Sequence, residues 1–265
     1  MRYTAAFIFL SLLFTHPALL AQNLSIDDIN NNLSRQDIAH IMPVIDKQLD
    51  FHSQHLDFPN KIQVPVHVFE DAKKYRKYRS RISTSSTSNN GFYSGSRKEV
   101  IINKNKKYLN TLKHEIQHFL LRSQTKSPPK WINEGLSELY ESSEVRGRRV
   151  FALKQNKKHE RLQKLLDADE IPTLRNWLDI SNQNWRKQNK DSAIRINSTL
   201  SWGLVYFLMS SEQGQSTLSQ TIHDLRISKS KQSAKYLDKN YRGGLSRLQR
   251  DFKNFVQILP PEIQL

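Results

Sequence analysis

The order of the predicted elements indicates an α+β fold, in which a small, mostly antiparallel sheet packs on one helix and a helical lobe follows. Alternating and β-branched segments lie before residue 108, whereas apolar residues at helical spacing dominate after it. We expect a helical segment at 22–57 and one domain at 58–258. Within that domain, residues 58–108 should be rich in strands, 109–145 should form two helices, and 146–258 should form the lobe.

Residues 1–21 have the pattern of a cleaved signal peptide, with Arg2, an apolar run at 5–14 and a small residue, Ala21, before the expected cut. The alternative is a membrane anchor, but a spanning helix needs about 20 apolar residues. No later segment is apolar enough to span a bilayer, so we expect an exported protein, periplasmic or secreted.

The first half of the mature chain alternates between helix and strand signals. Ser25 is a possible cap for a helix within 22–57. Residues 62–69 alternate and are β-branched, and Pro65 favours an edge or irregular position for this strand. Further elements are expected in chain order: a basic helix at 70–81, a loop at 83–90, and a hairpin of strands at 91–93 and 99–102.

The second half reads as mostly helical. A helix at 109–122 carries an apolar stripe, and Pro128 and Pro129 separate it from a second helix at about 131–143. The remaining expected segments are a long basic helix at 148–166, a polar and mobile stretch at 181–197, an apolar helix at 200–210, and two or three helices that reach Phe255.

Composition limits the chemistry. The chain has no cysteine, which excludes disulfides, cysteine-rich metal sites and thiol nucleophiles. Its net charge is +16, and removal of residues 1–21 leaves 40 basic and 25 acidic side chains. Such a surface is either simply solvated or attracts polyanions, for example an anionic polymer of the cell envelope. No nucleic-acid module is recognisable, so we expect no specific nucleic-acid partner.

His114, Glu115 and His118 form an H-E-x-x-H motif within the first of the two helices. Histidines four residues apart lie on one face of a helix, so both can reach one metal ion. Glu115, on the adjoining face, could take a proton from a water that Zn²⁺ makes acidic. The motif therefore predicts a zinc site with an open position, as hydrolysis requires.

Glu134 is the best candidate for the third ligand, because an antiparallel return of the chain would bring it opposite the histidines. Glu138, one turn further on, is expected to accept the other ring N–H of a ligand histidine, with Glu141 as the alternative. Gly135 should let the two helices approach closely, and Trp131 should pack beneath the site. The competing interpretation is an ordinary exposed acidic helix face. The other histidines lack ligand spacing.

The two motifs resemble those of the gluzincins, zinc metallopeptidases with H-E-x-x-H and a downstream glutamate ligand. Residues 131–135, Trp-Ile-Asn-Glu-Gly, resemble the W-x-N-E-G of the aminopeptidase branch, and Asn133 to Glu138 resembles the N-E-x-x-S-D of the thermolysin branch. The strand, the Gly-Phe-Tyr at 91–93 and the Ser-Trp element at 201–208 are similar to those of exported bacterial peptidase-MA-like proteins, over about residues 60–255.

This resemblance implies His114, His118 and Glu134 as zinc ligands, supported by Asn133, and Glu115 as general base. It also implies that residues 99–102 are an edge strand on which an extended peptide lies. One position departs from the family pattern: Ser198 is near the position at which the family often has a tyrosine, and gluzincins commonly use a tyrosine or histidine to stabilise the oxyanion. The alternative donors are Tyr206, His223 and Tyr241.

We therefore expect an exported zinc metallopeptidase whose partner is a peptide or protein substrate. The rival hypothesis is a catalytically weak protein of the same fold that binds an anionic envelope polymer through its basic surface. Chelator-sensitive cleavage of unstructured peptides would distinguish the first from the second, whose binding should weaken steeply with salt.

Overall fold

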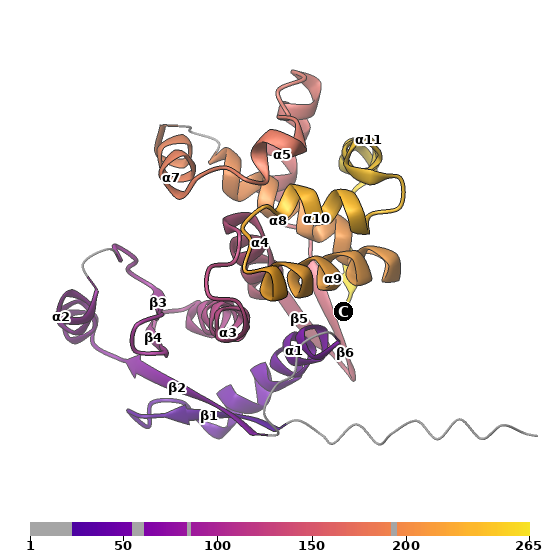
Figure 1. Ribbon diagram of the computed structural model, residues 1–265. Coiled ribbons are helices and arrows are strands. Elements are labelled where there is room, and N and C mark those ends of the chain that lie inside the picture. The colour runs from indigo at the N-terminus through magenta and orange to yellow at the C-terminus, as the bar shows by residue number, and fades with distance from the viewer. Residues whose placement is uncertain (1–22, 55–60, 84–85, 192–194) are drawn as a thin grey trace, which may run out of the picture.

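The computed structural model describes residues 23–54, 61–83, 86–191 and 195–265, and its elements make an α+β fold (Figure 1). The expected signal peptide at 1–21 lies outside the described residues. Two small sheets are present, one near the N-terminus and one in the second half of the chain. Within the described part of the chain, no helix is both long and apolar enough to cross a membrane.

The first sheet has four strands in the order β1 (Asn23–Asp28), β2 (Lys61–Phe69), β4 (Glu99–Asn103) and β3 (Gly91–Ser94). β1 and β4 both run parallel to β2, and only β3 is antiparallel, to β4. The prediction of a mostly antiparallel sheet is therefore wrong here. The hairpin of β3 and β4 was foreseeable from its short loop, whereas the two parallel pairings join segments that are distant in sequence.

The prediction of helix throughout 22–57 is wrong for β1 and right for α1 (Arg35–Ser53). Leu24 and Ile26 alternate with polar residues, which is the period of a strand. Ser25 lies within that strand, and the true helix cap is Ser34. Ser34 and Asp37 form a capping box, in which each side chain accepts from the other residue's backbone N–H.

β2 lies inside the sheet, not at its edge as Pro65 suggested. The missing N–H costs little, because pairing of β2 with β4 begins only at Val66. The predicted edge strand at 99–102 is also interior, since β4 lies between β2 and β3. The edge strand on that side of the sheet is β3.

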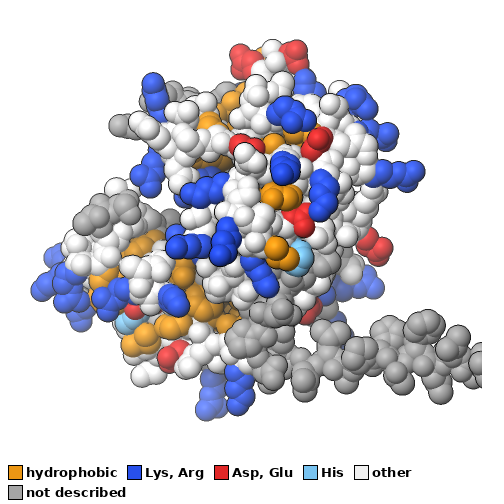
Figure 2. Space-filling model, in the orientation of Figure 1, with side chains coloured by type: hydrophobic (Ala, Val, Ile, Leu, Met, Phe, Trp, Pro, Cys, Tyr) orange, Lys and Arg blue, Asp and Glu red, His pale blue; other side chains and the backbone are white. Residues whose placement is uncertain are grey.

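Helices cover both faces of this sheet. Val64, Val66 and Val68 belong to the main core, with α1 and with α3 (Tyr108–Gln124). The alternate side chains His67 and Phe69 meet aromatic rings of α2 (Ala72–Ile82) on the opposite face. In Figure 2 Lys and Arg side chains gather over α2 at the outer edge of the molecule.

The second sheet was not predicted. β5 (Ser143–Arg146), β6 (Arg149–Leu153) and the C-terminal β7 (Glu262–Gln264) pair antiparallel. The predicted helix at 148–166 is therefore wrong over its first residues and begins later, as α5 (Asn156–Asp167). Gly147 lies in the turn between β5 and β6 with φ +61°, a backbone conformation that residues other than glycine rarely adopt.

The rest of the lobe is helical: α6 (Leu174–Trp177), α7 (Asn182–Asp191), α8 (Ile196–Met209), α9 (Glu212–Ser228), α10 (Ser233–Asn240) and α11 (Gly244–Ile258). The stretch at 181–197, predicted to be polar and mobile, contains the helix α7 in its described residues, and Trp185 of this helix is buried beside Trp177. The C-terminal helices are confirmed.

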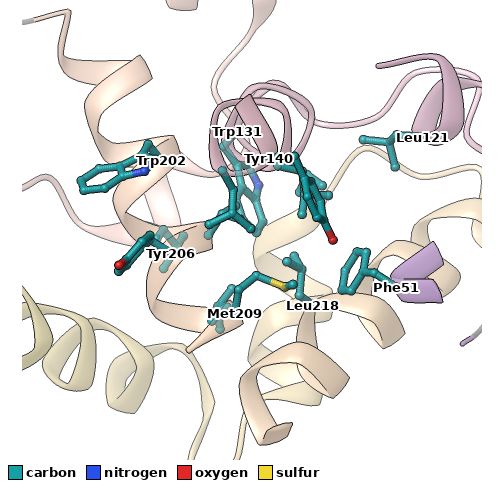
Figure 3. Packing of buried hydrophobic residues seen from close by; sticks show 14 of the residues in the cluster. Phe51, Leu121, Trp131, Tyr140, Trp202, Tyr206, Met209 and Leu218 are labelled. Carbon is teal, nitrogen blue, oxygen red and sulfur yellow. The ribbon is translucent and has the colours of Figure 1, made fainter. Parts of the chain in front are cut away.

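α8 is the centre of the lobe. It is apolar on nearly every side and buried along most of its length, as expected of a helix enclosed by others. It packs on α4 (Lys130–Glu141), and Figure 3 shows Trp131 and Tyr140 of α4 among Trp202, Tyr206 and Met209 of α8. This packing joins the lobe to the two helices that carry the predicted site.

Candidate metal centre

α3 and α4 are held in place by the apolar faces that they bury. Leu112, Ile116 and Leu120 of α3 are fully buried, which leaves both histidines of the motif on an adjoining, half-buried face. Trp131 of α4 is fully buried; its ring lies beside that of Trp177, and its Nε1–H donates to Ser233 Oγ at 2.9 Å.

Gly135 permits a close helix approach, but not the predicted one between α3 and α4. A Cβ built on Gly135 would lie 2.5 Å from the backbone oxygen of Ser201 and from Val205 Cγ2, both on α8. The glycine therefore sets the distance between α4 and α8. That contact fixes α4, and with it Glu134, relative to the lobe.

The structure brings His114, His118 and Glu134 together. Each offers one ligand atom, and these atoms lie within 4.8 Å of one another. His118 Nε2 is 4.0 Å from Glu134 Oε2. Two imidazoles and a carboxylate at this separation could hold a metal ion, with further positions left for water or substrate.

Hydrogen bonds from α4 orient both imidazoles. His114 Nδ1 lies 2.9 Å from Glu141 Oε2, and because a carboxylate only accepts, Nδ1 carries the proton. His118 Nδ1 lies 3.0 Å from Ser137 Oγ, whose own proton goes to the Asn133 carbonyl oxygen at 2.9 Å. Both Nε2 atoms are thus left as acceptors, the form that a metal ion requires.

The expected role of Glu138 is wrong. Its carboxylate contacts Lys158 Nζ of α5 and accepts from Ser198 Oγ at 2.7 Å, so it joins three helices instead of orienting a histidine. Glu141, the alternative, takes the role. Ser137 was missed, although it lies one turn after Glu134, where a side chain can face the same ligands.

Two groups on α4 contact Glu134. Asn133 Nδ2 donates to Glu134 Oε1 at 3.3 Å, which is consistent with its expected supporting role, and Lys130 Nζ lies 3.6 Å from the same oxygen. Burial acts to raise the pKa of Glu134, but the charges of His118 and Lys130 outweigh it and lower that pKa. The carboxylate therefore stays ionised, as a ligand must.

The two imidazoles respond differently to this environment. Burial lowers the pKa of His118 to about 3, against the opposing charge of Glu134, so this ring is neutral. Burial also acts against protonation of His114, but its hydrogen bond to Glu141 and the nearby charge of Glu115 raise its pKa to about 9. The carboxylates around His114 thus favour a positive charge at this point, which a proton or a metal ion can supply.

Glu115 is buried beside the first histidine. Burial raises its pKa to about 7, although the charge of His114 opposes the shift. The backbone N–H of Tyr93, in the edge strand β3, donates to its carboxylate. A carboxyl with a pKa near neutrality can both accept and return a proton at physiological pH.

Two of the three alternative oxyanion donors, Tyr206 and Tyr241, have hydroxyls that donate to groups outside this site. Tyr206 is fully buried and its hydroxyl donates to the Pro260 carbonyl oxygen at 3.1 Å. The Tyr241 hydroxyl donates to Asp251 at 2.9 Å, and His223 lies beside Gln220 on α9.

No curated protein matches the chain. A family model described as "Protein of unknown function (DUF1570)" matches residues 108–229, from the first residue of α3 to the cap that ends α9. The matched segment contains the three residues that could hold a metal ion, together with the helices that position them. The chain is thus similar, over its candidate metal centre and most of its helical lobe, to a family whose function is not known.

Proposed function

We propose that this protein is a zinc-dependent metallopeptidase of gluzincin type. The observation that carries the proposal is the grouping of His114, His118 and Glu134, with ligand atoms within 4.8 Å of one another. Glu115, a buried carboxyl with a pKa raised to about 7, lies next to one of these ligands in the chain. A structural zinc site would be closed by a fourth protein ligand, whereas three ligands leave a position for chemistry.

The donor set fits Zn²⁺. Zinc prefers imidazole nitrogen and carboxylate oxygen in a tetrahedral arrangement, and both histidines present an acceptor Nε2 because each Nδ1–H is engaged on α4. Lys130 partly offsets the negative charge of Glu134 but not that of the carboxylates beside His114. The remaining excess, seen in the raised pKa of His114, is what a divalent cation would offset.

The proposed reaction is hydrolysis of a peptide bond by water. Zn²⁺ bound by the three ligands would supply Lewis acidity, which polarises the peptide carbonyl and makes a water molecule acidic near neutral pH. Glu115 takes the proton of the attacking water and then gives it to the leaving amine nitrogen, so the carboxylate is regenerated in each turnover. Glu141 and Ser137 hold the two imidazoles in the tautomer that this requires.

β3 is the strand on which an extended peptide would lie. Asn103 N–H donates to the Asn90 carbonyl oxygen at 2.7 Å, so the backbone groups of Gly91 and Tyr93 face away from β4. The bond from Tyr93 N–H to Glu115 ties the general base to this outward edge. Strand addition at β3 would therefore present a peptide carbonyl beside the base.

The test is Glu115→Gln in the purified protein, assayed against a mixed library of unstructured peptides with and without chelator. The wild type should cleave and lose activity with chelator, and Glu115→Gln should lower the rate by at least about 100-fold while zinc stays bound. Glu144→Gln, at an exposed position of β5, is the matched control and should cleave normally. Loss of zinc together with activity would refute the assignment of Glu115 as base.

Export remains part of this proposal, on the pattern of residues 1–21 alone. An exported hydrolase would act on proteins or peptides of the periplasm or of the surroundings. Detection of the mature N-terminus near Gln22 in an extracytoplasmic fraction would support it.

A second candidate is binding of an anionic envelope polymer, and α2 is the feature that favours it. Lys73, Lys74, Arg76, Lys77 and Arg81 are exposed on this helix, and none has a carboxylate within 4.0 Å among the described residues. A pure binder would show no chelator-sensitive cleavage, and its affinity would fall steeply as salt is raised.

A further inference from the structure

A pocket separate from the candidate metal centre lies between the end of α3 and the end of α9. It has a volume of about 450 Å³. Its wall is formed by Lys126 and Ser127, which follow α3, and by Arg226, Lys229 and Lys231 at the end of α9. None of these residues belongs to the metal centre. In Figure 2 Lys and Arg side chains gather over the middle of this face, in the region where Figure 1 labels α3 and α9.

The four cations around this pocket are not neutralised by acids. No Asp or Glu lines it, and within the described residues none of the four has a carboxylate within 4.0 Å. Arg226 is half-buried, and its guanidinium donates to the Gln124 side-chain oxygen at 3.4 Å. Asp179 lines the neighbouring pocket, but it accepts hydrogen bonds from residues at the start of α10.

The partial negative charges of nearby helix ends offset only part of this positive charge. α3 ends at Gln124 and α9 ends at Ser228, so the pocket faces two helix C-termini. Each end is equivalent to roughly half a negative charge, about one in total. Four cations therefore leave an excess of about three positive charges. An excess of this size around one pocket favours an anion with more than one charge.

Thr125 adds a hydroxyl that is unpaired within the part of the chain that the structure describes. The residue lines the pocket, is only 6% exposed, and its Oγ1 is buried without a hydrogen bond among the described residues. A buried hydroxyl left unpaired costs free energy, so such groups are uncommon. Within the described residues, no existing hydrogen bond of this hydroxyl would be lost if it bound a ligand in the pocket. Ser127 and Ser230 supply further hydroxyls in the same wall.

We propose that this pocket binds a phosphate group, either as inorganic phosphate or as the phosphomonoester of a small molecule. A phosphate monoester carries about −1.5 to −2 charge at pH 7 and three strong acceptor oxygens. Arg226 and the three lysines match that charge, and the hydroxyls match the additional acceptors. A single carboxylate would leave most of the positive charge uncompensated. The site is separate from the metal centre and does not depend on the proposed peptidase activity.

The test is calorimetric titration of the purified chain with inorganic phosphate, with glycerol phosphate and with acetate, at constant ionic strength. We expect one phosphate to bind per chain and acetate to bind at least tenfold more weakly. Tighter binding of glycerol phosphate would identify the ester as the source of the phosphate, and tighter binding of inorganic phosphate would identify the free ion.

Variants then test the wall of the pocket. Arg226→Gln should weaken phosphate binding about tenfold, since a charge-assisted hydrogen bond is lost, and Thr125→Val about fivefold. Lys126→Gln, at an exposed position, gives the same test if a buried variant does not fold. Lys106→Gln removes an exposed charge outside the pocket and should leave the affinity unchanged. No saturable binding, equal binding of acetate, or an equal effect of Lys106→Gln would overturn the proposal.

Discussion

Replacing Glu141 by Gln should weaken zinc binding without removing a ligand. Glu141 Oε2 lies 2.9 Å from His114 Nδ1 and is one cause of the raised pKa of that imidazole. Gln keeps an acceptor oxygen of similar reach but loses the charge. Charged hydrogen bonds contribute about 1.5–3 kcal/mol and neutral ones about 0.5–1.5 kcal/mol, so the difference is about 1–1.5 kcal/mol.

That difference corresponds to a roughly five- to tenfold higher Kd for zinc. The Glu141 side chain is 41% exposed, so solvent screens part of its charge and the lower end of this range is the better expectation. Glu141→Ala, which also removes the acceptor, should approach the roughly 100-fold loss seen when such supporting residues are lost. Competition with a chromophoric chelator measures each Kd.

Glu138→Gln is the matched control, since Glu138 lies on the same helix but contacts Lys158 and Ser198 instead of a ligand. Its zinc Kd should stay within about twofold of the wild type, while its free energy of unfolding falls by about 2 kcal/mol because a buried charged contact is lost. If Glu138→Gln weakened zinc binding more than Glu141→Gln, the roles assigned to the two carboxylates would be wrong.

Three further outcomes follow from packing, titration and hydrogen bonding. Gly135→Ala would place a Cβ 2.5 Å from the Ser201 backbone oxygen, so chemical denaturation should show that the free energy of unfolding falls by about 3 kcal/mol. In the control Gly95→Ala, the added Cβ meets only the flexible Arg122 side chain, and the free energy of unfolding should hardly change. Burial lowers the pKa of His52 to about 4 from 6.5. The unfolded chain therefore takes up this proton first as pH falls, and up to about 3 kcal/mol of stability, present above pH 6.5, is lost between pH 6.5 and 4. Urea unfolding at pH 7.5 and 4.5 should show a shallower pH dependence for His52→Gln, and an unchanged dependence would contradict this. Tyr206→Phe should leave peptide hydrolysis within twofold of the wild type, because its hydroxyl is bonded elsewhere; a loss of 100-fold would make it the oxyanion donor.

The ligand set was predictable because its information is local. His114 and His118 are four residues apart, which places them on one helical face, and Glu134 follows after a short return that contains two prolines. The grouping of all three is confirmed. The identity of the metal and the hydrolytic activity stay predictions.

Contacts between the helices were not predictable in the same way. Glu138 and Glu141 are both within reach of a histidine by sequence spacing, and only the angle at which α4 crosses α3 decides between them. Gly135 was correctly expected to allow a close approach, but the partner is α8, more than 60 residues away in sequence. Ser137 is too common a residue type to signal a role by itself.

The strands show where local patterns are ambiguous. β1 and β6 are short, and each precedes a helix. The helical pattern of the following residues therefore led to a prediction of helix that included both strands. The parallel pairing of β1 with β2 joins segments more than 30 residues apart, and β7 pairs with β6 across nearly the whole lobe. Such pairings are set by tertiary packing, not by residue preference.

The claim that His114, His118 and Glu134 form a zinc centre is tested most directly by X-ray diffraction from crystals grown with zinc, at wavelengths on both sides of the zinc absorption edge. We predict one strong anomalous peak, with Nε2 of each histidine at about 2.0–2.1 Å and a Glu134 oxygen at about 2.0–2.2 Å. A peak absent from this site, or coordination through a histidine Nδ1, would contradict the account.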